Sequence, residues 1–167
     1  MPRTFFALWP DEEAAAALAR LSRKLAEDCG GKPVAREKIH LTLAFLGAVD
    51  AAALERAREI GSRLRCEPFD LVLDRVGSFR PARVAWAGFT QVPESLREVA
   101  EGLAVLLRGA GIELEERRFV PHVTLARRIR GDVAFASIEH VAWRVRGLAL
   151  VESEGGRYLN LETWETR

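Results

Sequence analysis

Two short segments of the sequence repeat one pattern around a histidine. Residues 38–46 read KIHLTLAFL, and residues 120–128 read VPHVTLARR. Both contain His-apolar-Thr-Leu-Ala, with the histidines at His40 and His122. A lone histidine in a strand is more often a packed or surface residue than a catalyst, and we interpret His140 in that way. The recurrence of two of the three histidines in one context instead favours chemistry.

Each motif places its histidine and its threonine on one face of an extended strand, because residues two apart in a strand point to the same side. His40 then lies beside Thr42, and His122 lies beside Thr124. A neutral imidazole accepts a proton and an imidazolium donates one, both near neutral pH. A threonine hydroxyl can donate to a phosphoryl oxygen or orient the imidazole. Two such faces opposite each other would supply an acid and a base on the two sides of a phosphorus atom, as in-line displacement requires.

A metal site is a poor alternative for the same residues. Neither His40 nor His122 has a carboxylate or a cysteine near it at ligand spacing, so a divalent ion would lack ligands. We therefore predict a site that uses no metal and no other cofactor.

Arginines lie close to the second motif, and Arg127 is the candidate that could bind phosphate charge. Strict strand alternation puts Arg127 on the face opposite His122, so a bulge or a strand end would be needed to bring it to the site. The arginine-rich stretch 117–130 can equally be a solvated surface.

The elements that must position these residues can be predicted from periodicity and turn residues. Asp11 and Asp50 are expected to cap helices, and Gly30 is expected to end the first one. Strands are predicted at residues 4–9, 39–46, 69–79, 82–89 and 119–127, helices at 12–29, 51–64 and 93–109, and a hairpin over 141–164 with its turn at Gly155 and Gly156. Mixed strands and helices with hairpins indicate an α+β fold, not a doubly wound parallel sheet.

The two motif copies predict two related, pseudo-symmetric lobes of antiparallel strands, with helices packed outside and a central cleft that carries both motifs. The repeat is short, so duplication and convergence both remain open as its origin. The length of 167 residues suits one domain over residues 1–167. The net charge of +1 neither predicts nor excludes a nucleic-acid partner, and local clustering of arginines would have to bind phosphate. With no signal-peptide pattern and no apolar run near bilayer length, we expect a cytoplasmic protein without a membrane partner.

At these residues the sequence resembles the 2H phosphoesterase superfamily, and most closely its RNA 2′,3′-cyclic phosphodiesterases, also called 2′-5′ RNA ligases. The resemblance covers nearly the whole chain and includes RTFFAL, KIHLTLAFLG, GSFRPARVAWAG, PHVTLAR and GGRYLNLETWE. The paired His-x-Thr-Leu motifs are its specific part, and the other segments are supportive.

The resemblance implies a function and a role for each site residue. It implies hydrolysis of a terminal 2′,3′-cyclic phosphate on RNA to a 2′-phosphomonoester, without a metal. His40 would be the proton donor to the leaving O3′, His122 the proton acceptor that activates water, and Thr42 and Thr124 would hold the non-bridging oxygens. The partners would be RNA 3′ ends, including tRNA fragments or nucleotides, and we expect a monomer.

Two other activities are compatible with the same fold. The same acid and base could join a cyclic end to a 5′-hydroxyl through a 2′-5′ linkage, which we expect to be weak because water outnumbers RNA ends. The chain could instead be a nucleotide- or RNA-binding module with little catalysis. Both motifs are intact, which argues against a degenerate site.

Overall fold

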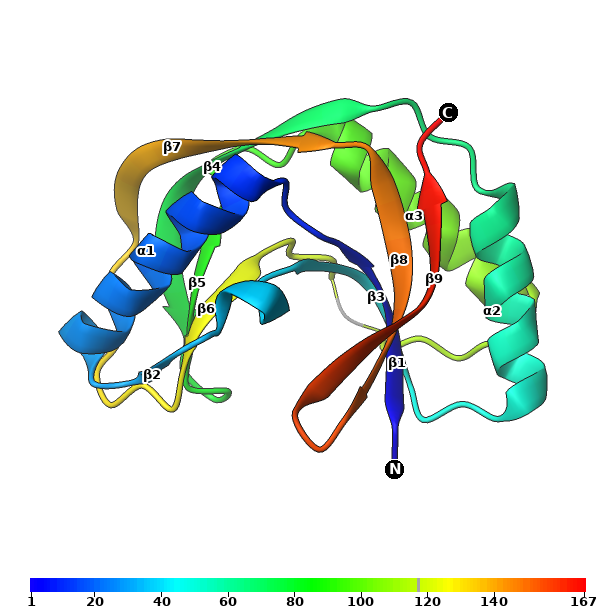
Figure 1. Cartoon of the computed structure of the whole chain (residues 1–167), viewed down its shortest axis with the longest axis horizontal. Coiled ribbons are helices and arrows are strands. Elements are labelled where there is room, and N and C mark those ends of the chain that lie inside the picture. The colour runs from blue at the N-terminus through cyan, green and yellow to red at the C-terminus, as the bar shows by residue number, and fades with distance from the viewer. Residues whose placement is uncertain (117) are drawn as a thin grey trace.

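The computed structural model describes residues 1–116 and 118–167, and its strands form one sheet of nine strands covered by three α-helices (Figure 1). The elements follow in the order β1 (Arg3–Leu8), α1 (Glu12–Cys29), β2 (Lys32–Pro33), a short 3₁₀ helix (Arg36–Lys38), β3 (Leu41–Gly47), α2 (Ala51–Arg63), β4 (Phe69–Phe79), β5 (Val84–Gly88), α3 (Glu94–Gly109), β6 (Val123–Arg127), β7 (Ala136–Val145), β8 (Gly147–Glu154) and β9 (Arg157–Glu165).

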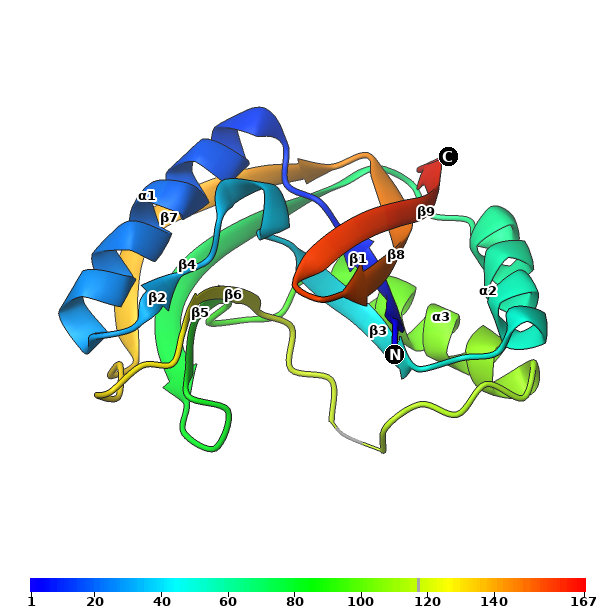
Figure 2. The ribbon, with the colours of Figure 1, turned by 60° about the horizontal axis from the view of Figure 1, so that its bottom comes forward.

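The sheet consists of two halves of four strands that meet in the middle. The strand order is β7-β4-β5-β6-β3-β1-β8-β9, the pairings are antiparallel, and β2 adds to β6 beside this path. The two motif strands, β6 and β3, are therefore the inner strands of the two halves. Helix α1 packs on the half that holds β6 and β7, while α2 and α3 pack on the half that holds β3, β8 and β9 (Figures 1 and 2). The predicted α+β class with two lobes and outer helices is confirmed.

Helix positions follow the capping residues that the sequence provides. The Asp11 side chain accepts a hydrogen bond from Ala14 N at 2.8 Å at the start of α1, and Gly30 ends this helix in the left-handed region at φ 68°. At α2, the Asp50 side chain accepts from Ala53 N at 2.7 Å. A side-chain acceptor at this position satisfies a backbone N–H that the first helical turn leaves unpaired. Both helices begin where the sequence predicts.

Two predicted strands were wrong in extent. The strand expected over 119–127 is paired only from Val123, because Pro121 has no N–H to donate to a ladder. The hairpin expected over 141–164 is confirmed at its turn, because β8 and β9 pair on either side of Gly155 and Gly156. Its first arm is two strands, since β7 ends at Val145 and pairs with β4, whereas β8 begins at Gly147 and pairs with β1 in the other half. The chain crosses between the halves at Arg146, and no proline or glycine cluster precedes this point in the sequence. Strand β2 and the 3₁₀ helix are not predicted from the sequence.

Candidate active site

The two motif strands touch at one pair of residues. Leu41 of β3 and Val123 of β6 are antiparallel partners, and each directly follows one of the two histidines. Both are fully buried at 0% exposure, so they point into the core. The flanking histidines and threonines are half-buried and point to the other face, because side chains alternate along a strand. The fold thus brings His40 and His122, 82 positions apart in the sequence, to the junction of the two lobes.

Each motif strand also carries an extra residue at the same position of the motif. In β3, Phe6 and Ala7 of β1 pair with Ala44 and Thr42, which leaves Leu43 unpaired. The same shift occurs in β6. There Ala85 and Trp86 of β5 pair with Ala126 and Thr124, which leaves Leu125 unpaired. An unpaired extra residue of this kind is a β-bulge, and it changes which face the following residues occupy.

The bulge in β6 resolves the position of Arg127. Leu125 and Ala126 are both buried in succession, and Arg127 is exposed, so the alternation of faces is interrupted before Arg127. The bulge is held from the core side. The carbonyl of Leu125 accepts hydrogen bonds from the buried hydroxyl of Ser22 and from Val34 N, the latter at 2.9 Å. The bulge that the sequence required for Arg127 is therefore present and fixed by α1 and the residue after β2.

Both imidazoles have the same backbone partner, two residues earlier in the chain. His40 Nδ1 lies 2.7 Å from the Lys38 carbonyl, and His122 Nδ1 lies 2.9 Å from the Val120 carbonyl. A carbonyl oxygen only accepts, so each Nδ1 carries a hydrogen and donates it. In the neutral ring the proton-accepting lone pair is then on Nε2. The two rings consequently offer the same nitrogen for proton transfer.

The threonines differ in their relation to the two rings. Thr42 Oγ1 lies 3.1 Å from His40 Nε2, so Thr42 contacts the reactive nitrogen of its own motif. Within the described residues, His122 Nε2 has no protein hydrogen-bond partner. Thr124 therefore leaves its histidine free to contact a bound molecule.

Aromatic rings surround His40 more completely than His122. Phe5 stacks on His40 with ring centroids 5.0 Å apart, while Trp9 and Tyr158 each lie 5.4 Å away. The edge of Phe79 contacts His122 with centroids 4.9 Å apart. These rings fix the imidazoles laterally and exclude water from one side of each. Aromatic residues in strands are usually core, so the sequence does not predict which of these rings reach the site.

Burial lowers the pKa of both imidazoles below 6.5, because it disfavours the charged form. The carbonyls of Lys38 and Val120 partly offset this by stabilising the protonated rings. The positive charge of Arg127 lowers both pKa values further, and a charge on His122 lowers that of His40. Arg127 therefore acts on both histidines, and the unliganded site favours two neutral rings near pH 7.

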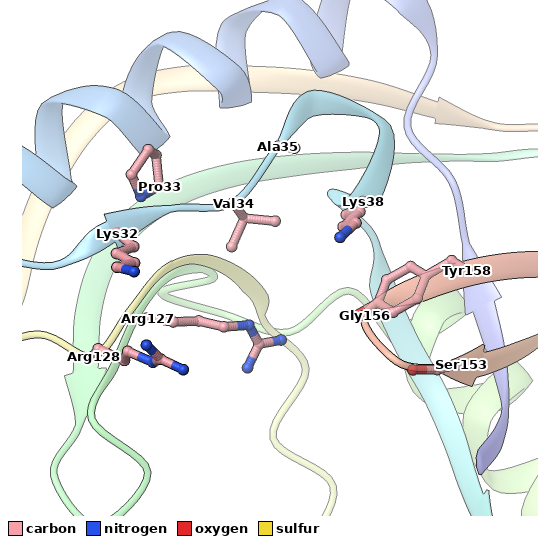
Figure 3. Close-up of a pocket in the computed structure, with 10 residues that line it drawn as sticks. All are labelled: Lys32, Pro33, Val34, Ala35, Lys38, Arg127, Arg128, Ser153, Gly156 and Tyr158. Atoms are coloured by element: carbon pink, nitrogen blue, oxygen red, sulfur yellow. The ribbon is translucent and has the colours of Figure 1, made fainter. Parts of the chain in front are cut away.

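A groove lies between the two lobes (Figure 3). Neither histidine lines it, but Tyr158 and Lys38 in its lining both contact His40. The residues that line it are Lys32, Pro33, Val34, Ala35, Lys38, Arg127, Arg128, Ser153, Gly156 and Tyr158. Arg127 reaches from β6 into the groove, and Lys38 and Tyr158 lie on its opposite side (Figure 3). The lining contains four cations and no carboxylate. Such a groove suits an anionic ligand, and Lys38 and Tyr158 are groove residues that the sequence analysis did not select.

The described residues contain no group of three or more histidine, cysteine or carboxylate side chains that could hold a metal ion. Over the same part of the chain, none of the helices has the length and apolarity to cross a bilayer. The two cysteines, Cys29 and Cys66, are unpaired thiols, of which Cys29 is buried.

The chain matches a known family of phosphoesterases. The model of LigT-like phosphoesterases matches residues 8–86 and 90–158, which is most of the chain. The chain therefore belongs to the family of LigT-like phosphoesterases within the 2H superfamily, and the resemblance seen in the sequence is confirmed.

Individual relatives agree with this assignment. A Thermus thermophilus protein named RNA 2′,3′-cyclic phosphodiesterase is 34% identical over 182 residues, an alignment that covers 99% of this chain and 90% of the relative. An Escherichia coli protein with the same name is 39% identical over 97 residues, which are 58% of this chain and about half (55%) of the relative. The crystal structure of E. coli LigT complexed with 3′-AMP matches with a TM-score of 0.89 at 31% identity, over 99% of both chains.

Proposed function

We propose that this chain hydrolyses the 2′,3′-cyclic phosphate at the 3′ end of RNA and leaves the phosphate on O2′. The observation that carries the proposal is the matched orientation of His40 and His122. Each ring donates Nδ1–H to a backbone carbonyl and presents Nε2, one from each lobe. Relatives with the name RNA 2′,3′-cyclic phosphodiesterase and the bound 3′-AMP of E. coli LigT support the choice of substrate.

The reaction needs one proton removed and one proton supplied. His122 Nε2 takes a proton from water, whose oxygen forms a bond to phosphorus. The bond between phosphorus and O3′ breaks on the opposite side, and the Nε2–H of protonated His40 gives its proton to O3′. The product is a 2′-phosphomonoester with a free 3′-hydroxyl. The two histidines end with exchanged protonation states and recover by proton exchange with solvent.

The assignment of acid and base uses the difference between the two rings. His122 Nε2 has no protein partner in the described structure, so its lone pair is available to water. His40 Nε2 contacts Thr42 Oγ1 at 3.1 Å, and this contact orients the ring when it is protonated. An anionic phosphate bound between the rings would raise the pKa of His40 and so supply the protonated acid.

The remaining polar groups would bind the phosphate itself. Thr42 and Thr124 would donate hydrogen bonds to its non-bridging oxygens, and the guanidinium of Arg127 would stabilise the charge that builds up at phosphorus. These roles follow from their common face at the junction and from the groove in which Arg127 lies (Figure 3). Since the described residues offer no cluster of metal ligands, the two histidines would carry out all proton transfer without a metal.

A phosphatase-coupled assay tests the proposal. A cyclic phosphate end resists phosphatase, whereas the monoester product releases inorganic phosphate when phosphatase is added. We expect release from a cyclic-ended oligoribonucleotide with the native chain and not with the His40→Ala/His122→Ala double variant. Mapping the product should place the phosphate on O2′. Binding of the oligonucleotide without any release would instead identify a binding module, and mainly 3′-phosphate would mean that the other bond is broken.

Ligation would use the same groups with an RNA 5′-hydroxyl in place of water. His122 would then take its proton from the 5′-hydroxyl, and in the reverse direction the new 2′-5′ linkage would be cleaved. Since water outnumbers RNA 5′-hydroxyls, we expect hydrolysis to dominate.

A further inference from the structure

Four basic residues continue the groove away from the histidines, and we refer to Lys32, Arg83, Arg128 and Arg130 as the distal basic patch. Lys32 and Arg128 line the groove itself together with Arg127 (Figure 3). Arg83 and Arg130 line a neighbouring pocket with Arg80, Ile129, Gly131 and Asp132. The β6–β7 loop, residues 128–135, contributes to both pockets, so the patch is continuous from Arg127 outward.

The patch is not neutralised by acidic partners. Within the described residues, none of its four side chains forms an ion pair with a carboxylate. Arg80, by contrast, pairs with Asp132 at 2.5 Å and is excluded from the patch for that reason. Arg83 uses its Nε to donate to the Ile129 carbonyl at 3.1 Å, which leaves the terminal nitrogens available. The patch therefore holds uncompensated positive charge beside a catalytic groove.

The backbone that carries the patch is held in an unusual conformation. Arg83 and Arg128, at φ 54° and 55°, are the residues other than glycine that adopt a left-handed backbone in the described structure. This conformation is unfavourable for L-residues and marks functional sites when the surroundings enforce it. Ile129, next to Arg128, donates its N–H to the carbonyl of Arg83. This hydrogen bond joins the two segments that hold the left-handed residues.

The end of α1 fixes the same loop. The Cys29 carbonyl accepts from Arg130 N at 2.8 Å and from Gly131 N at 3.2 Å. A side chain at Gly31 would collide with the carbonyl oxygen of Arg127, so close packing joins this loop to the start of β2. An alternative role for Arg130 is to compensate the negative end of the α1 dipole. That role accounts for one of the four cations and for neither left-handed arginine.

A pocket of the other lobe has a mostly acidic lining. The pocket at the start of α2 is lined by Asp50, Glu113 and Glu115, with Arg56 as its cation. Helix α2 and the strands β2 and β6 lie on opposite sides of the sheet junction (Figure 1). The cations of the groove and of the distal basic patch would attract a polyanion whose end is bound at the histidines.

We propose that the distal basic patch binds the backbone phosphates of the nucleotides that precede the cyclic end, so that the enzyme acts on RNA strands in preference to free cyclic nucleotides. This inference rests on the proposed function, since it presumes that the cyclic phosphate lies between the two histidines. Single-stranded RNA is commonly bound by a basic groove that follows its phosphates. The patch would add affinity without touching the reacting atoms.

The test compares two substrates in patch variants. The substrates are a 2′,3′-cyclic mononucleotide and a cyclic-ended oligoribonucleotide of about ten nucleotides, within the common site size of about 4–16. For the double variant Arg83→Gln/Arg130→Gln, kcat/KM on the oligonucleotide should fall about tenfold or more, since phosphate contacts dominate such binding, and kcat/KM on the mononucleotide should change less than about twofold. Arg97→Gln, an exposed arginine of α3, is the matched control and should leave both unchanged.

Binding measured without turnover separates this inference from the proposed function. Fluorescence anisotropy with a labelled oligonucleotide that ends in a 2′-phosphate should show an affinity that falls with salt. The slope should flatten by roughly 0.7 for each phosphate contact that a variant removes. Arg83→Lys keeps the charge and should retain most of the slope, which excludes a folding defect as the cause.

Two results would overturn the inference. One is an equal loss of kcat/KM on both substrates in the double variant, and the other is a salt slope that the variant leaves unchanged. A native chain that hydrolyses neither substrate would refute the proposed function, and the anisotropy slope would still decide whether the patch binds RNA.

Discussion

Leu43 and Leu125 are the corresponding bulge residues of the two motif strands: each follows a motif threonine, and each is skipped by the neighbouring strand. The two lobes therefore share a β-bulge at the same position of the motif, in addition to the repeated sequence. Two positions after each bulge residue the lobes differ, with Phe45 in one and Arg127 in the other. The two lobes therefore match in the motif and its bulge and differ in the residue that follows.

The first prediction concerns the charge of Arg127. Because that charge lowers the pKa of His40 and of His122, Arg127→Gln should raise the pKa of both rings. NMR titration of the His40 and His122 imidazole signals measures this directly. Arg128→Gln is the matched variant and should leave both titrations in place. A change in the pKa of only one imidazole would show that the charge of Arg127 does not act on both. Arg127→Gln should also have a lower kcat.

The pH dependence of the free enzyme follows from the same pKa shifts. In the proposed mechanism His122 is neutral and His40 is protonated, so kcat/KM should be bell-shaped. Burial lowers both pKa values, so the maximum should lie below 6.5 and kcat/KM should fall as the pH rises above that value, because His40 then loses its proton. Bound phosphate should move the alkaline limb of kcat to higher pH. A kcat/KM that rises steadily from about pH 6 to about pH 9 would contradict a histidine acid.

Metal removal should have no effect on hydrolysis. Among the described residues no three ligating side chains come together, so activity on a cyclic-ended RNA should survive excess EDTA. The measurement is the initial rate with and without chelator after dialysis against chelator. Loss of activity that a divalent ion restores would show that a metal takes part in the reaction.

Two glycines in helices should respond oppositely to the same substitution. Alanine normally stabilises a helix interior by about 0.5–1 kcal/mol relative to glycine. Gly102 of α3 has open space around its α-carbon, so Gly102→Ala should raise the free energy of unfolding by that amount. At Gly61 of α2 a methyl group would overlap the Trp164 ring, and overpacking costs about 1–3 kcal/mol. Chemical denaturation should therefore show a lower free energy of unfolding for Gly61→Ala. A higher free energy of unfolding for this variant would mean that β9 does not pack on α2 as described.

Much of the fold and the centre of the site could be predicted from local sequence. Helix starts at Asp11 and Asp50 depend on a capping side chain three residues from its N–H, and the pairing of His40 with Thr42 depends on strand alternation. Both are local relationships. The recurrence of the motif then predicted two lobes, because related strands tend to occupy related positions.

The parts that escaped prediction depend on contacts distant in sequence. Tyr158 reaches His40 only because β9 pairs with β8 and β8 with β1. The chain passes from one half of the sheet to the other at Arg146 because β7 pairs with β4 and β8 pairs with β1. The sequence on either side of Arg146 is rich in apolar residues and shows no break. The position of Arg127 required a bulge whose carbonyl is satisfied by Ser22, more than 100 positions away. Strand alternation alone gave the wrong face for Arg127.

The central claim is that His40 supplies a proton to the leaving group while His122 activates water, and the choice of leaving group tests it most directly. A ribose oxygen needs a proton as it leaves, and general acid catalysis contributes about 10²–10⁴-fold there. A nitrophenolate needs almost none. His40→Ala should therefore lose most of its kcat/KM on a cyclic-ended RNA and much less on a nitrophenyl phosphodiester bound with its phenolate beside His40. His122→Ala should lose kcat/KM on both substrates. Selective rescue of His122→Ala by the nitrophenyl ester would contradict the account, since it would make His122 the acid and His40 the base.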